Sequence, residues 1–156
     1  MKREKYLWPL SQSHHRALMA ARRIREALSA AGPDSGPVTE LTAEVKSLYD
    51  GELLQHFWDE ERILNLFESH VGCDDPDARR IRREHRLLES LAFQGTGECL
   101  LGFADLIVRH IRFEEDVLFG RIEAVLTDAE QKATGDILEH PPPARDVGQP
   151  TREGGW

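Results

Sequence analysis

Apolar residues recur three and four positions apart along most of the chain, and no stretch shows the period-two alternation of β-branched residues that is typical of a strand. This spacing gathers apolar side chains on one side of a helix, so it predicts an all-α protein. The expected long helices cover Leu10–Ala31, Thr39–His70, Asp77–Phe93 and Glu98–Leu126. The connections between them are short, which favours antiparallel neighbours and therefore an up-down-up-down four-helix bundle.

Glycine and proline mark the breaks between these helices, most clearly in the segment GPDSGP at 32–37. Beyond Leu126, the run from Thr127 to Glu130 has the pattern of a capping box, which predicts a short fifth helix reaching about Leu138. The expected organisation is an N-terminal arm over 1–9, the bundle over 10–126, the short C-terminal helix over 127–139 and a flexible tail over 140–156. The tail is rich in proline, glycine and charge, and it is poor in residues that could form a core.

Composition and charge narrow the class of protein. The 156 residues are 40% hydrophobic, which suits one globular domain. A net charge of −8 disfavours binding to nucleic acid or to an anionic membrane surface. No apolar run approaches the roughly 20 residues that span a bilayer, and the polar N-terminus lacks a secretory signal. A soluble, cytoplasmic protein is therefore expected. The two cysteines form no C-x-x-C pair, so a thiolate zinc site has little support.

A His-x-x-x-Glu pattern occurs in both the second and the fourth expected helix, as His56 with Glu60 and His110 with Glu114. Residues four apart share a helix face, with Cβ atoms about 5–6 Å apart, so each pair can bind the same small metal centre. Counting along the fourth helix places His110, Glu114 and Val117 in the apolar stripe. Charged groups in such a stripe are costly unless they are paired, hydrogen-bonded or bound to a metal.

The other two long helices supply matching histidines. His14 follows Leu10 by one helical turn, and His85 lies between apolar residues of the third helix. The same counting places Leu18 and Leu87 on the apolar faces of the first and third helices. One histidine in an apolar stripe is more often a hydrogen-bonded core residue than a ligand. Together, four histidines and two glutamates directed inward from four helices predict a metal site, with a metal-free interaction bundle as the alternative.

Four segments that contain these residues, LSQSHHRAL, HFWDEERIL, REHRLLESL and HIRFEEDVLFGRIEAVL, resemble the hemerythrin-like, or HHE cation-binding, domains. The resemblance covers roughly Leu10 to Leu126 and implies a four-helix bundle with a non-haem centre of two iron ions. It implies that Glu60 and Glu114 bridge the two ions. The implied metal ligands are His14, His56, Glu60, His85, His110 and Glu114.

Five positions near this site stay open. His15 points about 100° away from His14 on a helix, so it is expected on the helix surface or hydrogen-bonded to a ligand from outside. Oxygen-carrying hemerythrins have two histidines four apart in the third helix, whereas here Glu89 follows His85. Glu89 is either a carboxylate ligand or a solvent-facing residue that leaves a coordination position to water. Glu61 and Glu115 are interpreted as outer-face residues or as outer partners of ligands. Tyr49 either approaches the centre or packs in the core.

An imidazole and carboxylate set suits iron, manganese and zinc alike, so iron follows only from the resemblance. The leading functional hypothesis is a di-iron protein that binds a small diatomic ligand, O2 or NO, or that senses oxygen and iron. A di-iron redox enzyme acting on peroxide or NO is the alternative, and a metal-free helical interaction module is a second one. No nucleic acid or membrane is expected as a partner, and the sequence leaves protein partners and oligomeric state open.

Overall fold

The structure is a computed structural model that describes residues 5–34 and 36–139. Within these ranges the elements are helices joined by short turns, and no strand occurs, which confirms the expected all-α class. No helix in the described ranges is long and apolar enough to cross a membrane. The flexible tail expected over 140–156, and the first four residues of the expected N-terminal arm, lie outside the described residues.

The first long helix starts earlier than the sequence indicated. A 3-10 turn, η1 (Lys5–Leu7), leads directly into α1 (Trp8–Ala31), and Leu7 is fully buried. Pro9 lies in the first turn of α1, where its missing N–H leaves no helical hydrogen bond unmade. The described part of the expected arm is therefore an ordered piece of the fold. Gly32 ends α1 at a positive φ of 85°, and its N–H donates to the carbonyl of Leu28 at 2.8 Å.

The second and fourth long helices each contain a π turn. The second comprises α2 (Pro37–Leu48), η2 (Tyr49–Leu53) and α3 (Leu54–Val71), and the fourth comprises α5 (Gly97–Phe113), η3 (Glu114–Leu118) and α6 (Phe119–Val125). Between them runs the uninterrupted α4 (Pro76–Gln94), whose N-cap Asp75 accepts from the N–H groups of Asp77 and Ala78. A π turn fits one more residue into a turn than an α-helix does, so the buried face shifts along the sequence beyond it.

This shift corrects one sequence assignment. Val117, which periodic counting placed in the apolar stripe, is 40% exposed, whereas Leu118 is 2% exposed and Phe119 is equally buried. The extra residue of η3 rotates Val117 out of the core.

Leu18 and Leu87 were also wrongly assigned to apolar faces, because their neighbours Ala17 and Leu88 occupy the helix interfaces instead.

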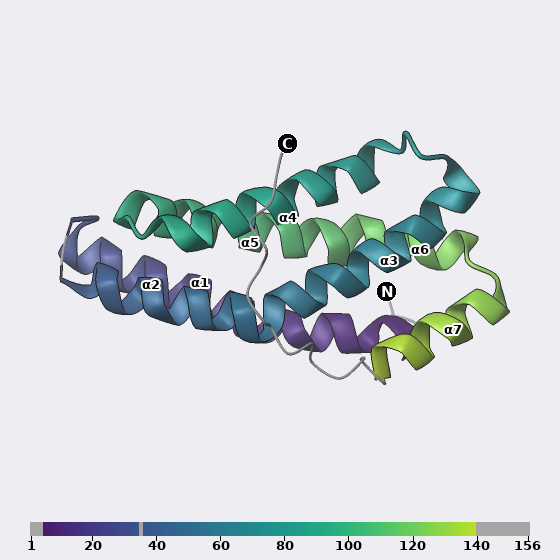
Figure 1. Ribbon diagram of the computed structural model, residues 1–156, viewed down its shortest axis with the longest axis horizontal. Helices are drawn as coiled ribbons and strands as arrows, with labels where there is room; N and C mark the ends of the chain where they lie inside the picture. The colour runs from purple at the N-terminus through teal and green to yellow at the C-terminus, as the bar shows by residue number, and fades with distance from the viewer. Residues whose placement is uncertain (1–4, 35, 140–156) are drawn as a thin grey trace, which may run out of the picture.

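The long helices pack along one another, with α5 in contact with both α1 and α4, α1 in contact with α2, and α3 in contact with α4. Figure 1 shows the α1–α2 and α4–α5 connections together at one end of the molecule and the α3–α4 connection at the other. Gly97 lies so close to the backbone of Pro33 that a Cβ at this position would collide with it, which explains the glycine where these two connections meet.

The short fifth helix, α7 (Asp128–Glu139), packs on η1 beside α1 and α3. Its capping box is present: the Thr127 N–H donates to the Glu130 carboxylate at 2.8 Å, and the Glu130 N–H donates to the Thr127 hydroxyl at 3.3 Å. Near the C-terminal end of α7, Leu138 belongs to the same hydrophobic cluster as Leu7 of η1.

The hydrophobic core is divided into two clusters. One cluster contains Leu28, Tyr49 and Phe103 and lies toward the α1–α2 connection. The other contains Leu10, Phe67 and Phe119 and lies toward α6 and α7. Along α1, His14 lies between Leu10 of one cluster and Ala17 of the other. The inward polar residues therefore form a layer between two apolar layers.

Candidate metal centre

The six residues expected as metal ligands meet in this polar layer. His14 comes from α1, His56 and Glu60 from α3, His85 from α4, His110 from the last turn of α5, and Glu114 from the start of η3. All six are buried, and none is more than 6% exposed. The structure thus brings together every residue that the sequence selected, from four separate helical segments.

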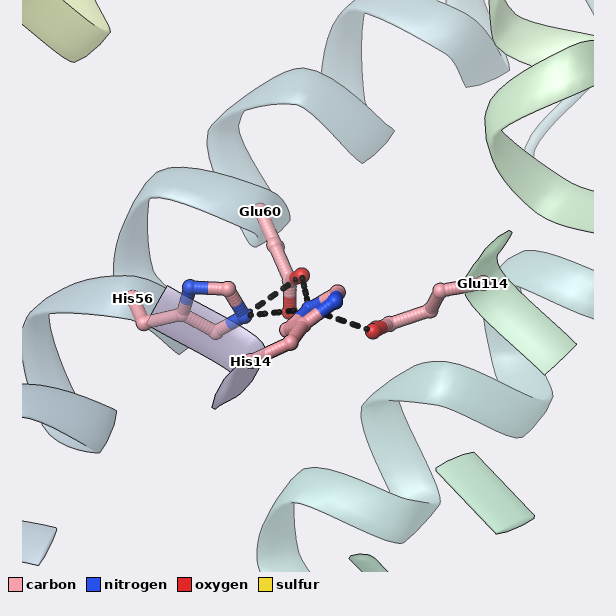
Figure 2. Close-up of side chains that lie close together, drawn as sticks. All are labelled: His14, His56, Glu60 and Glu114. Carbon is pink, nitrogen blue, oxygen red and sulfur yellow. Dashed lines mark hydrogen bonds and ion pairs between the residues drawn. The ribbon is translucent and has the colours of Figure 1, made fainter. Parts of the chain in front are cut away.

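The ligand atoms of these residues form two overlapping groups. His14 and His56 belong to the first group, His85 and His110 belong to the second, and both Glu60 and Glu114 belong to each. Within each group the ligand atoms lie within 4.8 Å of one another. Figure 2 shows the first group, with the two imidazoles and the two carboxylates directed toward a common point.

The inward contacts are made by the Nε2 atoms of the histidines. In the first group, Nε2 of His56 lies 2.9 Å from Oε1 of Glu60, and Nε2 of His14 lies 3.2 Å from Oε2 of Glu114. In the second group, Nε2 of His85 lies 3.1 Å from Oε2 of Glu60. The corresponding distance from Nε2 of His110 to Oε1 of Glu114 is 2.9 Å. Each glutamate therefore presents one oxygen to each group.

In three of the four histidines, the ring nitrogen that faces away from the cluster contacts a carboxylate. Nδ1 of His14 lies 2.9 Å from Oε1 of Glu115, which stands next to Glu114. The other two pairs, both measured from Nδ1 to a carboxylate oxygen, are His85 with Glu61 at 2.9 Å and His110 with Glu84 at 2.8 Å. A carboxylate only accepts, so each Nδ1 carries the hydrogen and each Nε2 is left to face inward.

The fourth histidine, His56, is held by a hydroxyl. Oγ of Ser13 lies 2.6 Å from Nδ1 of His56 and also donates to the carbonyl of Leu10 at 2.8 Å. Because the single hydroxyl hydrogen is used on Leu10, the Nδ1–H of His56 donates to Ser13. The hydrogen again sits on Nδ1, and Nε2 faces the cluster.

Two of these outer partners, Ser13 and Glu84, were not identified from the sequence. Glu61 and Glu115 were considered, and the structure places them as partners of the inward His85 and His14. A signal for the missed pair does exist in the chain, since Ser13 directly precedes His14 and Glu84 directly precedes His85. Each outer partner is thus the sequence neighbour of one inward residue and supports a histidine on another helix.

The imidazoles and carboxylates of the cluster stabilise each other's charged forms and so shift each other's pKa values. Burial opposes a charged imidazole at His14, but the facing carboxylates of Glu114, Glu115 and Glu60 outweigh it and raise the pKa to about 11. For His110, burial acts the same way, and the carboxylates of Glu114 and Glu84 raise the pKa to about 10. Burial raises the pKa of Glu114, yet the facing imidazoles lower it overall. Without a bound cation, the cluster at neutral pH holds imidazolium groups against carboxylates.

Several buried atoms of the cluster nevertheless lack a hydrogen bond. Nε2 of His110, both carboxylate oxygens of Glu114 and Oε1 of Glu60 have no hydrogen-bond partner, although they lie at ion-pair distances from opposite charges. Buried polar atoms are rarely left without one. A cation among these atoms would satisfy all of them at once, so the donor set fits a metal better than a closed network of protein hydrogen bonds.

The positions left open by the sequence are placed as follows. His15 is exposed and belongs to neither group of ligand atoms. Glu89 is also exposed and belongs to neither group, so the structure gives no support to its role as a ligand. Tyr49 is buried and packs edge-on against Phe57 and Phe93, as a core residue does.

A comparison with protein families agrees with this geometry. The family described as the hemerythrin HHE cation binding domain matches residues 8–122, a range that contains all six inward residues. The chain belongs to the hemerythrin HHE cation-binding family, which confirms the resemblance found in its segments. Neither the curated proteins nor the solved structures gave a significant match.

Proposed function

We propose that the chain binds two iron ions in its buried His/Glu cluster and uses them to bind or sense a small diatomic ligand, O2 or NO. The observation that carries this proposal is the pair of overlapping ligand groups that share Glu60 and Glu114. Two groups with a common pair of carboxylates are the arrangement expected for two neighbouring cations bridged by those carboxylates.

In this assignment His14 and His56 hold one ion, and His85 and His110 hold the other. The mixture of imidazole and carboxylate suits iron, and membership of the family supports a cation site. Bound iron would supply an electron-rich centre with coordination positions for a diatomic ligand. Two imidazoles and two shared carboxylates leave each ion with fewer protein ligands than the six that octahedral iron accepts.

The chain's own residues prepare the site for this task. The outer partners hold the imidazole rings with Nε2 inward, which aims four neutral donors at the cluster once their protons have left. The apolar layers on either side, represented by Phe103 and Phe119, keep bulk water away from the cluster. A dry site of this kind strengthens electrostatic interactions inside it.

We also propose that the four long helical segments form the up-down-up-down bundle expected from the sequence. Support comes from the contacts of α5 with α1 and α4 and from the short connections at opposite ends of the molecule. In this arrangement each segment contributes at least one histidine to the polar layer.

The test is the metal content of the full chain after expression with iron, combined with absorption spectra recorded under argon and then under air. About two irons per chain and an oxygen-dependent band that reverses when oxygen is removed are expected. Absence of bound metal after reconstitution with iron would refute the proposal and favour the metal-free interaction module. Catalytic consumption of added peroxide or NO, with iron retained, would assign the chain to the di-iron redox enzymes instead.

A further inference from the structure

A pocket of about 270 Å³ opens between η2 and α3 on one side and α4 on the other. Its lining includes Phe57 and His85, and the charged residues Glu61, Arg86 and Glu89. His85 is the one inward histidine among the lining residues. The pocket therefore approaches the polar layer from the side of the second ligand group, which contains His85 and His110.

Phe57 and His85 together form the wall between the pocket and the rest of this group. The Phe57 ring stacks on His85, with centroids 4.2 Å apart and planes 16° apart, and meets the ring of His110 edge-on at 5.6 Å. Both lining rings are buried, since Phe57 and His85 are each 4% exposed. His110 and the shared carboxylates do not line the pocket, so a molecule in it would contact Phe57 and His85 and would be separated from the rest of the second ligand group by these two stacked rings.

Glu89 lies one helical turn beyond His85 on α4 and lines the same pocket. It is exposed, and it contributes no atom to either ligand group. The pocket side of the second group is therefore bounded by the rings of Phe57 and His85, and Glu89 adds no ligand atom there.

The lining also indicates the kind of molecule that fits. A water molecule occupies about 30 Å³ in the liquid, so the pocket has room for a ligand of several heavy atoms. Arg62 and Arg86 line it together with Glu61 and Glu89, which offers both donors and acceptors to a small polar molecule. Hydrogen peroxide and small anions such as azide belong to this chemical class.

We propose that this pocket is the route by which a small ligand reaches the ion held by His85 and His110, and that Phe57, stacked on His85, is its gate. The inference rests on the proposed function, because it requires a bound ion. It assigns ligand access to the second group, since neither His14 nor His56 lines the pocket.

The test uses azide as the probe and follows its binding to the iron-loaded full chain by absorption, both at equilibrium and by stopped flow. Glu89→Trp places a large ring in the pocket, and Leu87→Trp is the matched control, because Leu87 is exposed on the same helix and does not line the pocket. We expect Glu89→Trp to slow azide association by at least about tenfold, because access is blocked, while Leu87→Trp leaves it unchanged.

Two further measurements make the outcome decisive. Phe57→Leu shortens the wall and should speed azide association, and Glu89→Gln should retain the same iron content per chain as the unmodified protein. Wild-type azide kinetics in both Glu89→Trp and Phe57→Leu would overturn the access route while leaving the iron site intact. Loss of iron in Glu89→Gln would also overturn it by identifying Glu89 as a ligand. A chain that binds no iron at all would refute the proposed function itself.

Discussion

The two ring nitrogens of His14 are contacted by two adjacent glutamates. Nε2 of His14 lies 3.2 Å from Glu114, and Nδ1 lies 2.9 Å from Glu115, a residue 101 positions further along the chain. Glu114 is fully buried and belongs to both ligand groups, whereas Glu115 is partly exposed and belongs to neither. The imidazole is thereby held in one orientation, with one nitrogen toward the cluster and the other toward its edge.

Contacts between an outer partner on one helical segment and a histidine on the next run around the whole cluster and form a closed ring. Ser13 of α1 supports His56 of α3, and Glu61 of α3 supports His85 of α4. Glu84 of α4 then supports His110 of α5, and Glu115 of η3 supports His14 of α1. Each segment thus orients a ligand on the next, so the rotation of each helix about its axis is coupled to the site.

Replacing Glu115 by glutamine should weaken metal binding about 10- to 100-fold, because the amide keeps the shape but removes the charge that orients His14 and makes it a stronger donor. The measurement is a competition titration against a chelator of known affinity. Asp116→Asn serves as the control, since Asp116 is the exposed next residue and belongs to neither ligand group. Equal affinities for the two variants would show that the contact of Glu115 with His14 does not tune the site.

The number of ions per chain should depend on which ligand is removed. His56→Ala affects only the first group and should leave about one ion per chain, bound by the second group. Glu60→Ala removes a carboxylate common to both groups, so both ions should be weakened together. Elemental analysis after gel filtration measures the stoichiometry, and circular dichroism establishes that each variant is folded. A chain that retains two ions in Glu60→Ala would contradict the shared role of that carboxylate.

Metal binding should strengthen as the pH rises from about 6 to 9. The pKa values of His14 and His110 are raised to about 11 and about 10, so both imidazoles are protonated in the metal-free protein and must lose a proton to bind a cation. Each displaced proton should change the apparent affinity about tenfold per pH unit. An indicator dye in weak buffer should report proton release when Fe²⁺ is added. His70→Ala, outside both groups, should release as many protons as the unmodified protein.

The metal-free protein should be most stable in mildly acidic solution. The raised pKa values of His14 and His110 mean that their stabilising contacts are complete below the ordinary value of 6.5 and are lost as the pH rises through about 10 and 11. The lowered pKa of Glu114 contributes stability above its ordinary value of 4.5 that is lost as the pH falls through the lowered value. Urea unfolding of the metal-free chain from pH 3 to pH 11 measures the loss of stability at both the acidic and the alkaline end. A free energy of unfolding that rises steadily up to pH 11 would contradict the contribution of His14 and His110.

The π turn η3 can be tested through two neighbouring side chains. Leu118→Ala should cost about 2–5 kcal/mol of unfolding free energy because a buried side chain is removed from the core. Val117→Ala should change the stability by no more than about 0.5 kcal/mol, because Val117 is exposed. Chemical denaturation of the two variants gives the comparison. The reverse order of costs would indicate a regular helix through this segment, with Val117 in the core.

The helices and the inward-facing His and Glu residues could be predicted from the sequence because they depend on local spacing. Apolar residues three and four apart define helix faces, and the spacing of His56 with Glu60 directs both side chains to one side of a helix. The capping box at Thr127 is likewise a matter of neighbouring residues, and its hydrogen bonds are present. For interactions within one helical turn, the chain alone carries the necessary information.

Only the tertiary structure decided how the inward histidines are supported and where a pocket adjoins them. Ser13 meets His56 across 43 residues and Glu84 meets His110 across 26, because the packing of separate helices sets their relative rotation and stagger. A periodic pattern leaves both of these quantities free. The exposure of Val117 has a related cause, since periodic counting assumes an unbroken α-helix through η3. The pocket beside Phe57 also requires two packed helices, so no pattern along a single helix could indicate it.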